Sequence, residues 1–390
     1  MKAKIKCERS SSMIKTVIVA CLVSFASVPG FAQTDAATVV DAGKLLVELV
    51  PRTGMAFMDS HAGIGLSIGV FDNGRTHFYH FGSTRTDQSQ VPSKDTVYEI
   101  GSITKSITGI LLARAAIDGK VKLDDDVRKY LEGEYPNLTF EGEPIRLMHL
   151  ANSTSSLPDN LPDISDALSK ISPDELPFAL VRILEPYTKR NFLDDLHKVT
   201  LKAKPGVDSA HSNAAPQLLS YVLERVYGAP FEELVARFVE RPLGLKSGTA
   251  AVLTMAKGHN GKGIEMPLLT MKTAEAAGGL RFSVADMTKY IAFQLDERDE
   301  TVALSHKATW QTLDRQHSVG LYWNISKTDR GRRLSSSGGT FGFSSFCDIY
   351  PDQKLGIVLL ANKSDETAQD GLRKASESIV EAIRKTTLPR

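Results

Sequence analysis

The sequence predicts a mixed α/β fold in which one antiparallel sheet, built from both ends of the chain and flanked by helices, carries an inserted and mainly helical subdomain. Two observations predict it: strand–turn–strand patterns near both ends, and helical spacing between them. The composition agrees, since the 390 residues are 42% hydrophobic and 24% charged. This balance excludes a disordered tail protein, a collagen-like repeat and a coiled coil.

The strand patterns are alike at the two ends of the chain. Gly65–Phe71 is an apolar run that leads into the tight-turn sequence Asp72-Asn73-Gly74, and Thr76–Phe81 is its expected hairpin partner. Near the other end, Ser344–Tyr350 and Leu355–Ala361 repeat this pattern. We therefore expect two hairpins that belong to one sheet.

The remaining elements are expected to be mostly helical. Apolar residues at helical spacing predict helices over Ser106–Asp118, Pro216–Tyr227 and Gln369–Lys385. Leu157–Glu185 is rich in Pro, Asp and Ser and is expected to be an irregular excursion. The sheet-containing part is then expected at about 38–120 and 275–390, with the helical insertion at about 121–274.

The N-terminus has the pattern of a secretory signal peptide. Basic residues precede an apolar run from Thr16 to Val28, which is followed by Pro29-Gly30 and by small residues before a plausible cleavage after Ala32. The run is too short for a membrane span, which needs about 20 residues. We expect residues 1–32 to be removed, and residues 33–390 to be secreted across the inner membrane into the periplasm without a transmembrane anchor. The alternative is a buried N-terminal helix.

Charge and cysteine content exclude several classes of partner and site. The formal net charge is +1, and no basic stripe is present, so a nucleic-acid partner is not expected. Only Cys347 remains after the signal peptide, so no internal disulfide is expected. No histidine pair has metal-site spacing, and His77 and His80 are expected to be packing or surface residues. We therefore expect no metal and no cofactor.

Ser102 and Lys105 form the first candidate for chemistry. They are three residues apart at the start of a predicted helix, a spacing that places the hydroxyl and the ammonium on one face. A desolvated lysine beside a serine can activate it as a nucleophile, and a helix N-terminus favours a developing anion. A second Ser-x-x-Lys, Ser12 to Lys15, lies in the signal peptide, so the spacing alone is a weak signal.

The residues around this pair give the pattern its specificity. Several segments follow in the order found in the penicillin-recognising serine hydrolases, and the chain from about Gly65 to Asn362 resembles that family, most closely its AmpH-type periplasmic branch. The family includes class C β-lactamases, DD-peptidases and esterases. The matching segments are Thr96–Gly109, Asp118–Asp126, Ile145–Pro158, Pro205-Gly206, His211-Ser212-Asn213, Arg241–Leu245, Ala277–Asp286 and Ser336–Phe343.

The resemblance implies a β-lactamase/transpeptidase-like fold and a role for each matched residue. Ser102 would be the nucleophile and Lys105 its activating partner, while Asn213 would bind the substrate amide and help to hold Lys105. The backbone N–H groups of Ser102 and Gly339 would form the oxyanion hole, where one donor contributes roughly 3 to 4 kcal/mol. The strand that begins Ser336-Ser337-Gly338 would line the substrate site.

Four positions depart from the family pattern. His211 replaces a tyrosine, Ser336 replaces a cationic Lys or His, Ser153 replaces a histidine and Ser156 replaces a glycine. An imidazole, with a reference pKa of about 6.5, could relay a proton to the leaving group as the tyrosine does. The alternative is that His211 fills space and hydrogen-bonds a neighbour.

The loss of the cation at Ser336 bears on the substrate. Arg332 and Arg333 could compensate if the strand turns them inward, whereas arginines so placed are more often solvated. Without compensation, penicillins and D-Ala-D-Ala peptides, which carry a carboxylate, should bind poorly, and a neutral ester or amide should suffer less.

Three functions are open at this point. The leading hypothesis is an exported serine hydrolase that forms an acyl-enzyme with a small-molecule or peptide substrate, an amide, peptide or ester that could derive from the cell wall. The second is a catalytically weakened protein that binds or senses cell-wall fragments. The third is a β-lactamase.

Overall fold

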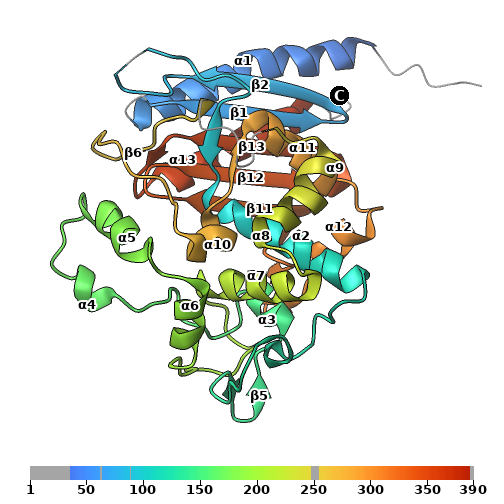
Figure 1. Cartoon of the computed structure of the whole chain (residues 1–390). Coiled ribbons are helices and arrows are strands. Elements are labelled where there is room, and N and C mark those ends of the chain that lie inside the picture. The colour runs from blue at the N-terminus through green and yellow to red at the C-terminus, as the bar shows by residue number, and fades with distance from the viewer. Residues whose placement is uncertain (1–35, 62–63, 88, 247–253, 387–390) are drawn as a thin grey trace, which may run out of the picture.

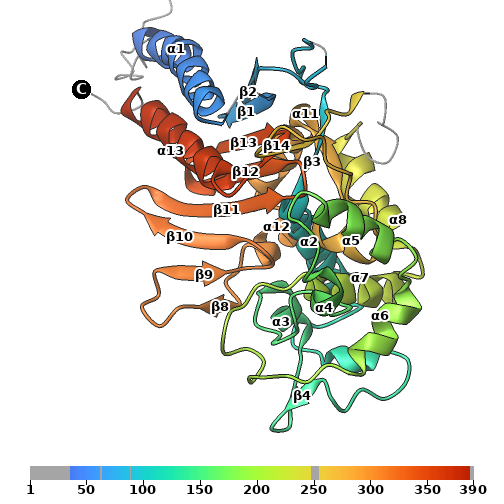
Figure 2. The same ribbon diagram turned by 90° about the vertical axis from the view of Figure 1, so that its left-hand side faces the viewer.

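The computed structural model describes residues 36–61, 64–87, 89–246 and 254–386, so the predicted signal peptide lies outside the described residues. Eight strands form one antiparallel sheet in the order β2-β1-β13-β12-β11-β10-β9-β8 (Figures 1 and 2). The sheet therefore joins strands from both ends of the chain, as predicted. Its strands are β1 (Leu66–Asp72), β2 (Arg75–Phe81), β8 (Trp310–Gln311), β9 (His317–Val319), β10 (Asn324–Thr328), β11 (Gly331–Gly339), β12 (Ser344–Tyr350) and β13 (Leu355–Ala361).

The two predicted hairpins are confirmed, and local sequence explains them. Asn73 and Gly74 link β1 to β2 with φ angles of +47° and +86°, the left-handed pair that a two-residue hairpin turn requires. All seven residues of β13 are buried because this strand lies between β1 and β12 and is covered on both faces. The sequence of such a strand is a continuous apolar run and does not alternate between apolar and polar residues, so the strand can be recognised from the sequence.

Helices cover both faces of the sheet. On one face lie α1 (Ala36–Ser60) and α13 (Ala368–Thr386), side by side over β1, β12 and β13 (Figure 2). On the other face α11 (Val284–Gln294) packs directly on β1 and β13. Gly69 and Gly356 permit this approach, because a Cβ on either would lie 2.4 Å from Thr288 Oγ1 or 2.1 Å from Ile291 Cγ2, respectively.

The helical part of the molecule lies beyond α11 and surrounds the buried helix α2 (Figure 1). The helices predicted at 106–118, 216–227 and 369–385 are confirmed as α2, α7 and α13. Together with α2 and α7, the other helices, 3₁₀ turns and one π turn of the described residues are η1 (Gly101–Ile103), α2 (Thr104–Ile117), η2 (Val127–Tyr130), α3 (Leu147–Ala151), α4 (Ser165–Leu168), α5 (Leu176–Leu184), α6 (Lys189–Leu196), α7 (Ala214–Tyr227), α8 (Phe231–Val235), η3 (Ala236–Glu240), α9 (Arg241–Leu243), η5 (Lys272–Ala274), α10 (Glu275–Gly278), α12 (Glu300–Ser305) and η6 (Pro351–Gln353).

Three short strand pairs complete the described fold. The pair β3–β7 is antiparallel, and its strand β3 directly precedes the Ser102 segment; β4–β5 is a small hairpin, and β6–β14 is parallel. Their bounds are β3 (Val97–Glu99), β4 (Thr139–Phe140), β5 (Glu143–Pro144), β6 (His259–Asn260), β7 (Arg281–Ser283) and β14 (Lys363–Ser364).

The expectation of an irregular segment at Leu157–Glu185 is partly wrong. The segment contains the short helices α4 and α5. In α5 the proline follows the first residue, where it removes no intrahelical hydrogen bond, so Pro177 permits the helix instead of ending it. The apolar run that follows supplies the helix with residues of good propensity.

Candidate active site

Ser102 lies in the 3₁₀ turn η1, directly before α2, where the sequence places it. The preceding Gly101 has a φ angle of +51°, and a Cβ there would meet the backbone N of Gly339 at 2.5 Å. Only glycine tolerates both the left-handed backbone and this close approach. Gly101 thus brings the Ser102 turn against the end of β11.

Lys105 lies at the centre of a compact hydrogen-bonded group. Its Nζ donates to Ser102 Oγ at 2.8 Å, to Asn213 Oδ1 at 2.8 Å and to the carbonyl oxygen of Ala277 at 3.0 Å. Only 7% of Lys105 is exposed. Burial lowers the pKa of the Lys105 ammonium to about 8, against an opposing effect of the Asp159 carboxylate, because a charged group is costly to desolvate.

The short helix α10 holds α2 in place. Thr108 Oγ1 of α2 donates to the carbonyl oxygen of Ala276 at 2.9 Å, next to the Ala277 carbonyl that binds Lys105. The backbone N–H of Leu280 donates to Thr104 Oγ1 at 3.3 Å. The segment at 277–286, which resembles a family signature, therefore supports the lysine through the Ala277 carbonyl.

Asn213 is presented by the N-terminal end of α7. Its Oδ1 accepts from Lys105, and its Nδ2 donates to Asn160 Oδ1 at 3.2 Å. The two bonds use opposite ends of the amide and so fix its orientation. Ser102, Lys105 and Asn213, which the sequence separates by up to 111 positions, are thus brought together.

The proposed oxyanion donors come from two segments in close contact. A Cβ on Gly338 would lie 2.1 Å from the Ile100 carbonyl oxygen and 2.8 Å from the Ser102 backbone N, so β11 runs directly against the Ser102 turn. Gly339 lines the same cavity as Ser102. Gly338, which is expected to bind substrate, packs against the backbone of Ile100 and Ser102.

His211 lines the cavity that contains Ser102 and Lys105. Its Nδ1 lies 2.6 Å from Asp159 Oδ1, and the side chains of this pair are 63% and 53% exposed. The imidazole is therefore an accessible group on the cavity wall and is not packed into the core. Its carboxylate partner was not foreseen from the sequence.

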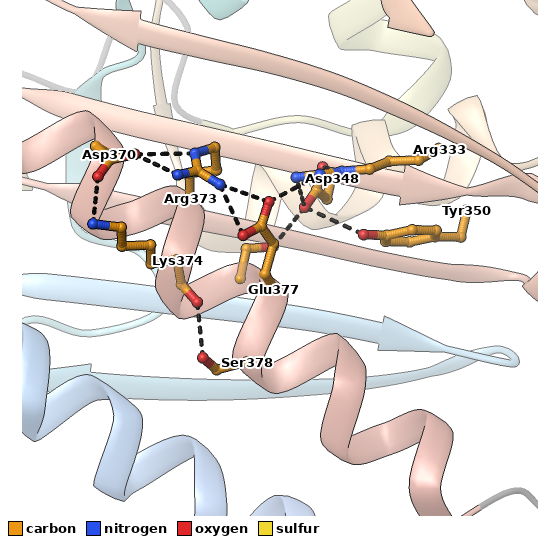
Figure 3. Close-up of polar contacts among 9 residues, drawn as sticks. Arg333, Asp348, Tyr350, Asp370, Arg373, Lys374, Glu377 and Ser378 are labelled. Carbon is orange, nitrogen blue, oxygen red and sulfur yellow. Dashed lines mark hydrogen bonds and ion pairs between the residues drawn. The ribbon is translucent and has the colours of Figure 1, made fainter. Parts of the chain in front are cut away.

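Arg332 and Arg333 do not turn into the cavity. Arg332 pairs with Glu297 at 2.6 Å, and Arg333 pairs with Asp348 at 2.8 Å and with Glu377 of α13 at 3.0 Å. Figure 3 shows the Arg333 guanidinium within this network between the sheet and α13. Neither arginine compensates for the missing cation at Ser336, because both are held by carboxylates away from the cavity lining.

The cavity has a volume of about 1760 Å³, larger than the about 300–1,000 Å³ typical of sites for drug-sized ligands. Along its β9–β11 side the lining residues are uncharged: Val319, Tyr322, Asn324, Ser336 and Ser337. Tyr322 was missed by the sequence analysis. It has a φ angle of +63°, and its phenol oxygen is buried without a hydrogen-bond partner among the described residues.

Two findings concern what the described part of the chain lacks. Within residues 36–61, 64–87, 89–246 and 254–386, no three His, Cys, Asp or Glu side chains are grouped to hold a metal ion. In the same ranges no helix has the length and hydropathy of a membrane span.

The cysteine expected to remain after removal of the signal peptide, Cys347, is a free, buried thiol.

Comparison with known proteins decides the family. The model of the Beta-lactamase family matches residues 52–380, most of the chain. The chain belongs to the Beta-lactamase family. The resemblance to penicillin-recognising serine hydrolases is thereby confirmed, and the chain is a β-lactamase-like protein of a serine hydrolase family.

Relatives within the Beta-lactamase family agree in fold and extent. The chain is 26% identical to the D-alanyl-D-alanine-carboxypeptidase/endopeptidase AmpH of Escherichia coli (strain K12), over 78% of this chain and 80% of AmpH. A β-lactamase/D-alanine carboxypeptidase from Yersinia pestis, complexed with citrate, superposes with a TM-score of 0.74 at 23% identity, over 89% of this chain and 99% of that one. A class C β-lactamase from Rhodobacter sphaeroides gives a TM-score of 0.71 at 23% identity, covering 86% and 99%. These structures confirm the predicted α/β fold.

Proposed function

We propose that the protein is an exported serine hydrolase that forms an acyl-enzyme on Ser102 with an amide, peptide or ester substrate. One observation carries this proposal: a buried lysine with a pKa of about 8 has its Nζ 2.8 Å from the Ser102 hydroxyl. Export to the periplasm is supported by the signal-peptide pattern of residues 1–32.

The lowered pKa of Lys105 matters because only a neutral amine can accept the serine proton. With a pKa of about 8, roughly a tenth of Lys105 is neutral at pH 7, whereas roughly 0.03% would be neutral at its ordinary pKa of about 10.5. Burial thus raises the population of the active base by a factor of a few hundred. Its distance to Ser102 Oγ satisfies the geometry of general-base catalysis.

In the proposed reaction, neutral Lys105 accepts the proton as Ser102 Oγ attacks the substrate carbonyl carbon. The resulting oxyanion is held by the backbone N–H groups of Ser102 and Gly339. The bond to the leaving nitrogen or oxygen then breaks, its electron pair stays on that atom, and a proton relayed through His211 neutralises it. Water repeats the sequence on the acyl-enzyme and releases the acid.

The cavity wall favours a substrate without a carboxylate at the β11 side. Ser336 and Ser337 are uncharged, and Arg332 and Arg333 are held by Glu297 and by Asp348. A carboxylate placed beside Ser336 would lose water without gaining a cation, which is unfavourable. Neutral esters and amides, including cell-wall peptides bound away from their free carboxylate, fit this wall better than penicillins.

The first test is intact-protein mass spectrometry after exposure to a fluorophosphonate probe, with Ser102→Ala in parallel. We expect an adduct on the wild-type protein and none on the variant. If the folded wild-type protein carries no adduct, Ser102 is not activated and the proposal fails. Rapid nitrocefin turnover would instead identify a β-lactamase and contradict the argument from Ser336.

A second candidate function, binding or sensing of cell-wall fragments without turnover, is favoured by the altered positions Ser153, His211 and Ser336. It predicts saturable muropeptide binding by the purified protein and no product. Cleavage of the bound muropeptide would exclude it.

The proposed relay through His211 has its own test, the dependence of hydrolysis on the leaving group. A pH profile would not isolate His211, because protonation of Lys105, whose pKa is about 8, already lowers activity toward acidic pH. His211→Phe should slow hydrolysis of an anilide, whose leaving nitrogen must be protonated, more than hydrolysis of a p-nitrophenyl ester. Equal losses on both substrates would make His211 a structural residue.

A further inference from the structure

The segment Pro158–Asn160 binds the start of α7 residue by residue. Ser212 Oγ donates to the Pro158 carbonyl oxygen at 2.8 Å. The backbone N–H groups of Asn213 and Ala214 donate to the Asp159 carbonyl oxygen at 2.7 and 3.0 Å, and Asn213 Nδ2 donates to Asn160. These bonds satisfy N–H groups that a helix N-terminus leaves without intrahelical partners. Asp159 is therefore anchored by its backbone to the residues that follow His211.

With its backbone held in this way, Asp159 contacts His211 through its side chain. Its Oδ1 lies 2.6 Å from His211 Nδ1, a short hydrogen bond to a charged acceptor. Because a carboxylate only accepts, the hydrogen of this bond is on Nδ1. A neutral imidazole held in this way keeps Nε2 unprotonated.

We infer that Asp159 is a positioning residue that holds His211 in the tautomer with hydrogen on Nδ1, leaving Nε2 free to relay the proton to the leaving group. The inference rests on the proposed function, since it assigns a partner to the relay. The tautomer itself is a property of the resting protein and can be measured without any substrate.

The proton balance explains why this tautomer is needed. The proton that Ser102 gives to Lys105 must reach the leaving nitrogen or oxygen. Nε2 accepts it, the ring becomes an imidazolium stabilised by the Asp159 carboxylate, and Nε2 then passes it to the leaving atom as its bond to carbon breaks. His211 ends neutral, and no proton is gained or lost. With hydrogen on Nε2 instead, the ring could not accept the proton on that side.

Asp159 is hydrogen-bonded to His211, whereas the other charged side chains of the cavity for which partners are described here bind elsewhere. Lys198 is paired with Asp195 at 2.6 Å, and Asp163 accepts hydrogen bonds from Ser165. Asp159 also acts on the nucleophile side, since its charge opposes the burial effect on Lys105. The charged groups on the cavity wall around His211 and Asp159 are Lys105, Asp163, Asp195, Lys198, Lys202 and Asp208.

The test compares Asp159→Asn with the wild-type protein by ¹⁵N NMR of histidine-labelled samples at pH 8, with the His211 signals assigned from His211→Phe. We expect ring shifts of a single Nδ1–H tautomer in the wild type and shifts moved toward a mixture in Asp159→Asn. Asp163→Asn is the matched control, an acid of the same cavity without contact to His211, and should leave the shifts unchanged. A wild-type Nε2–H tautomer, or identical shifts in Asp159→Asn, overturns the inference.

Kinetics add a readout that a purely structural role would not give. Hydrolysis of N-acetyl-p-nitroaniline requires protonation of its leaving nitrogen, whereas p-nitrophenolate leaves p-nitrophenyl acetate without a proton. In Asp159→Asn we expect kcat for the anilide to fall about 10- to 100-fold, within the usual contribution of general acid–base catalysis, with KM little changed. The ester should lose less than threefold, and Asp159→Glu should recover part of the anilide rate.

The outcomes separate this inference from the proposed function. Fluorophosphonate labelling of Ser102 expels fluoride and should persist in Asp159→Asn, because it depends on Lys105. Labelling of both proteins with equal anilide and ester losses would remove the Asp159 role while leaving the serine hydrolase in place. Absence of labelling in the wild type would remove the proposed function, and the ¹⁵N shifts would still decide whether Asp159 sets the His211 tautomer.

Discussion

Replacing Lys105 with methionine removes a buried charge at nearly constant side-chain volume, and the structure gives the size of the effect. The pKa of Lys105 falls from 10.5 to about 8 on folding. Each unit corresponds to about 1.4 kcal/mol, so holding the protonated lysine in the folded state costs about 3 kcal/mol at pH 7. Lys105→Met also loses the three hydrogen bonds that Nζ donates, each worth about 1 kcal/mol.

The pH dependence isolates the charge from the hydrogen bonds. Between the folded pKa of about 8 and the unfolded value of 10.5, the unfolded wild-type chain binds more protons than the folded one, so wild-type stability rises with pH. The cost is fully present below pH 8, falls to about 2 kcal/mol at pH 9 and disappears above the unfolded pKa. Lys105→Met lacks this term, so its stability relative to the wild type should decrease by about 1 kcal/mol from pH 7 to pH 9.

Urea denaturation of both proteins at pH 7 and pH 9 measures this difference directly. Lys307→Met, which replaces an exposed lysine, is the control and should show no such change relative to the wild type. A stability difference between Lys105→Met and the wild type that is the same at both pH values would refute the reasoning, because Lys105 would then keep its ordinary pKa. Lys105→Met should also lose fluorophosphonate labelling.

Three further changes probe the support of the site. Gly338→Ala would place a Cβ 2.8 Å from the Ser102 backbone N, and we expect a loss of about 1–3 kcal/mol in unfolding free energy and at least tenfold slower probe labelling. Ser153→Gly should raise the unfolding free energy by about 0.5–1 kcal/mol, because Ser153 has a φ of +64° and relief of this strain exceeds the added chain entropy; an unchanged melting temperature would contradict this. Asp348→Asn leaves the Arg333 guanidinium without its buried partner, so we expect about 3 kcal/mol lower stability by urea denaturation, with labelling retained at 25 °C because the pair lies outside the cavity. Loss of labelling in a folded Asp348→Asn protein would show that the pair supports the site.

The sequence predicted the strands from β2 to β12 well and the other side of the sheet, from β11 to β8, poorly. β13 is a continuous apolar run and β12 contains Phe346, Cys347, Ile349 and Tyr350, and both strands are buried along their whole length. β11, with the sequence GRRLSSSGG, has little strand propensity and is held by its ladders to β10 and β12. The long helix α1 was likewise not predicted.

The candidate active site likewise combines residues that the sequence predicted with residues that only the structure revealed. The spacing of Ser102 and Lys105 is local, because three residues on a helical turn place two side chains on one face whatever surrounds them. Asn213 and Gly339 could be assigned only through the family resemblance. Asp159 and Tyr322 belong to no motif that the sequence analysis used, and only their position in the cavity reveals them.

The sequence by itself thus indicated the family through the order of its motifs, and it indicated the sheet built from both chain ends and the serine–lysine pair through local periodicity and covalent spacing. Tertiary structure decided the direction of Arg332 and Arg333, because the register of β11 and the carboxylates of Glu297 and Asp348 set it. It also decided the pKa of Lys105 and the pairing of His211 with Asp159. These depend on desolvation and on contacts between residues far apart in the chain, and neither is encoded in any single segment.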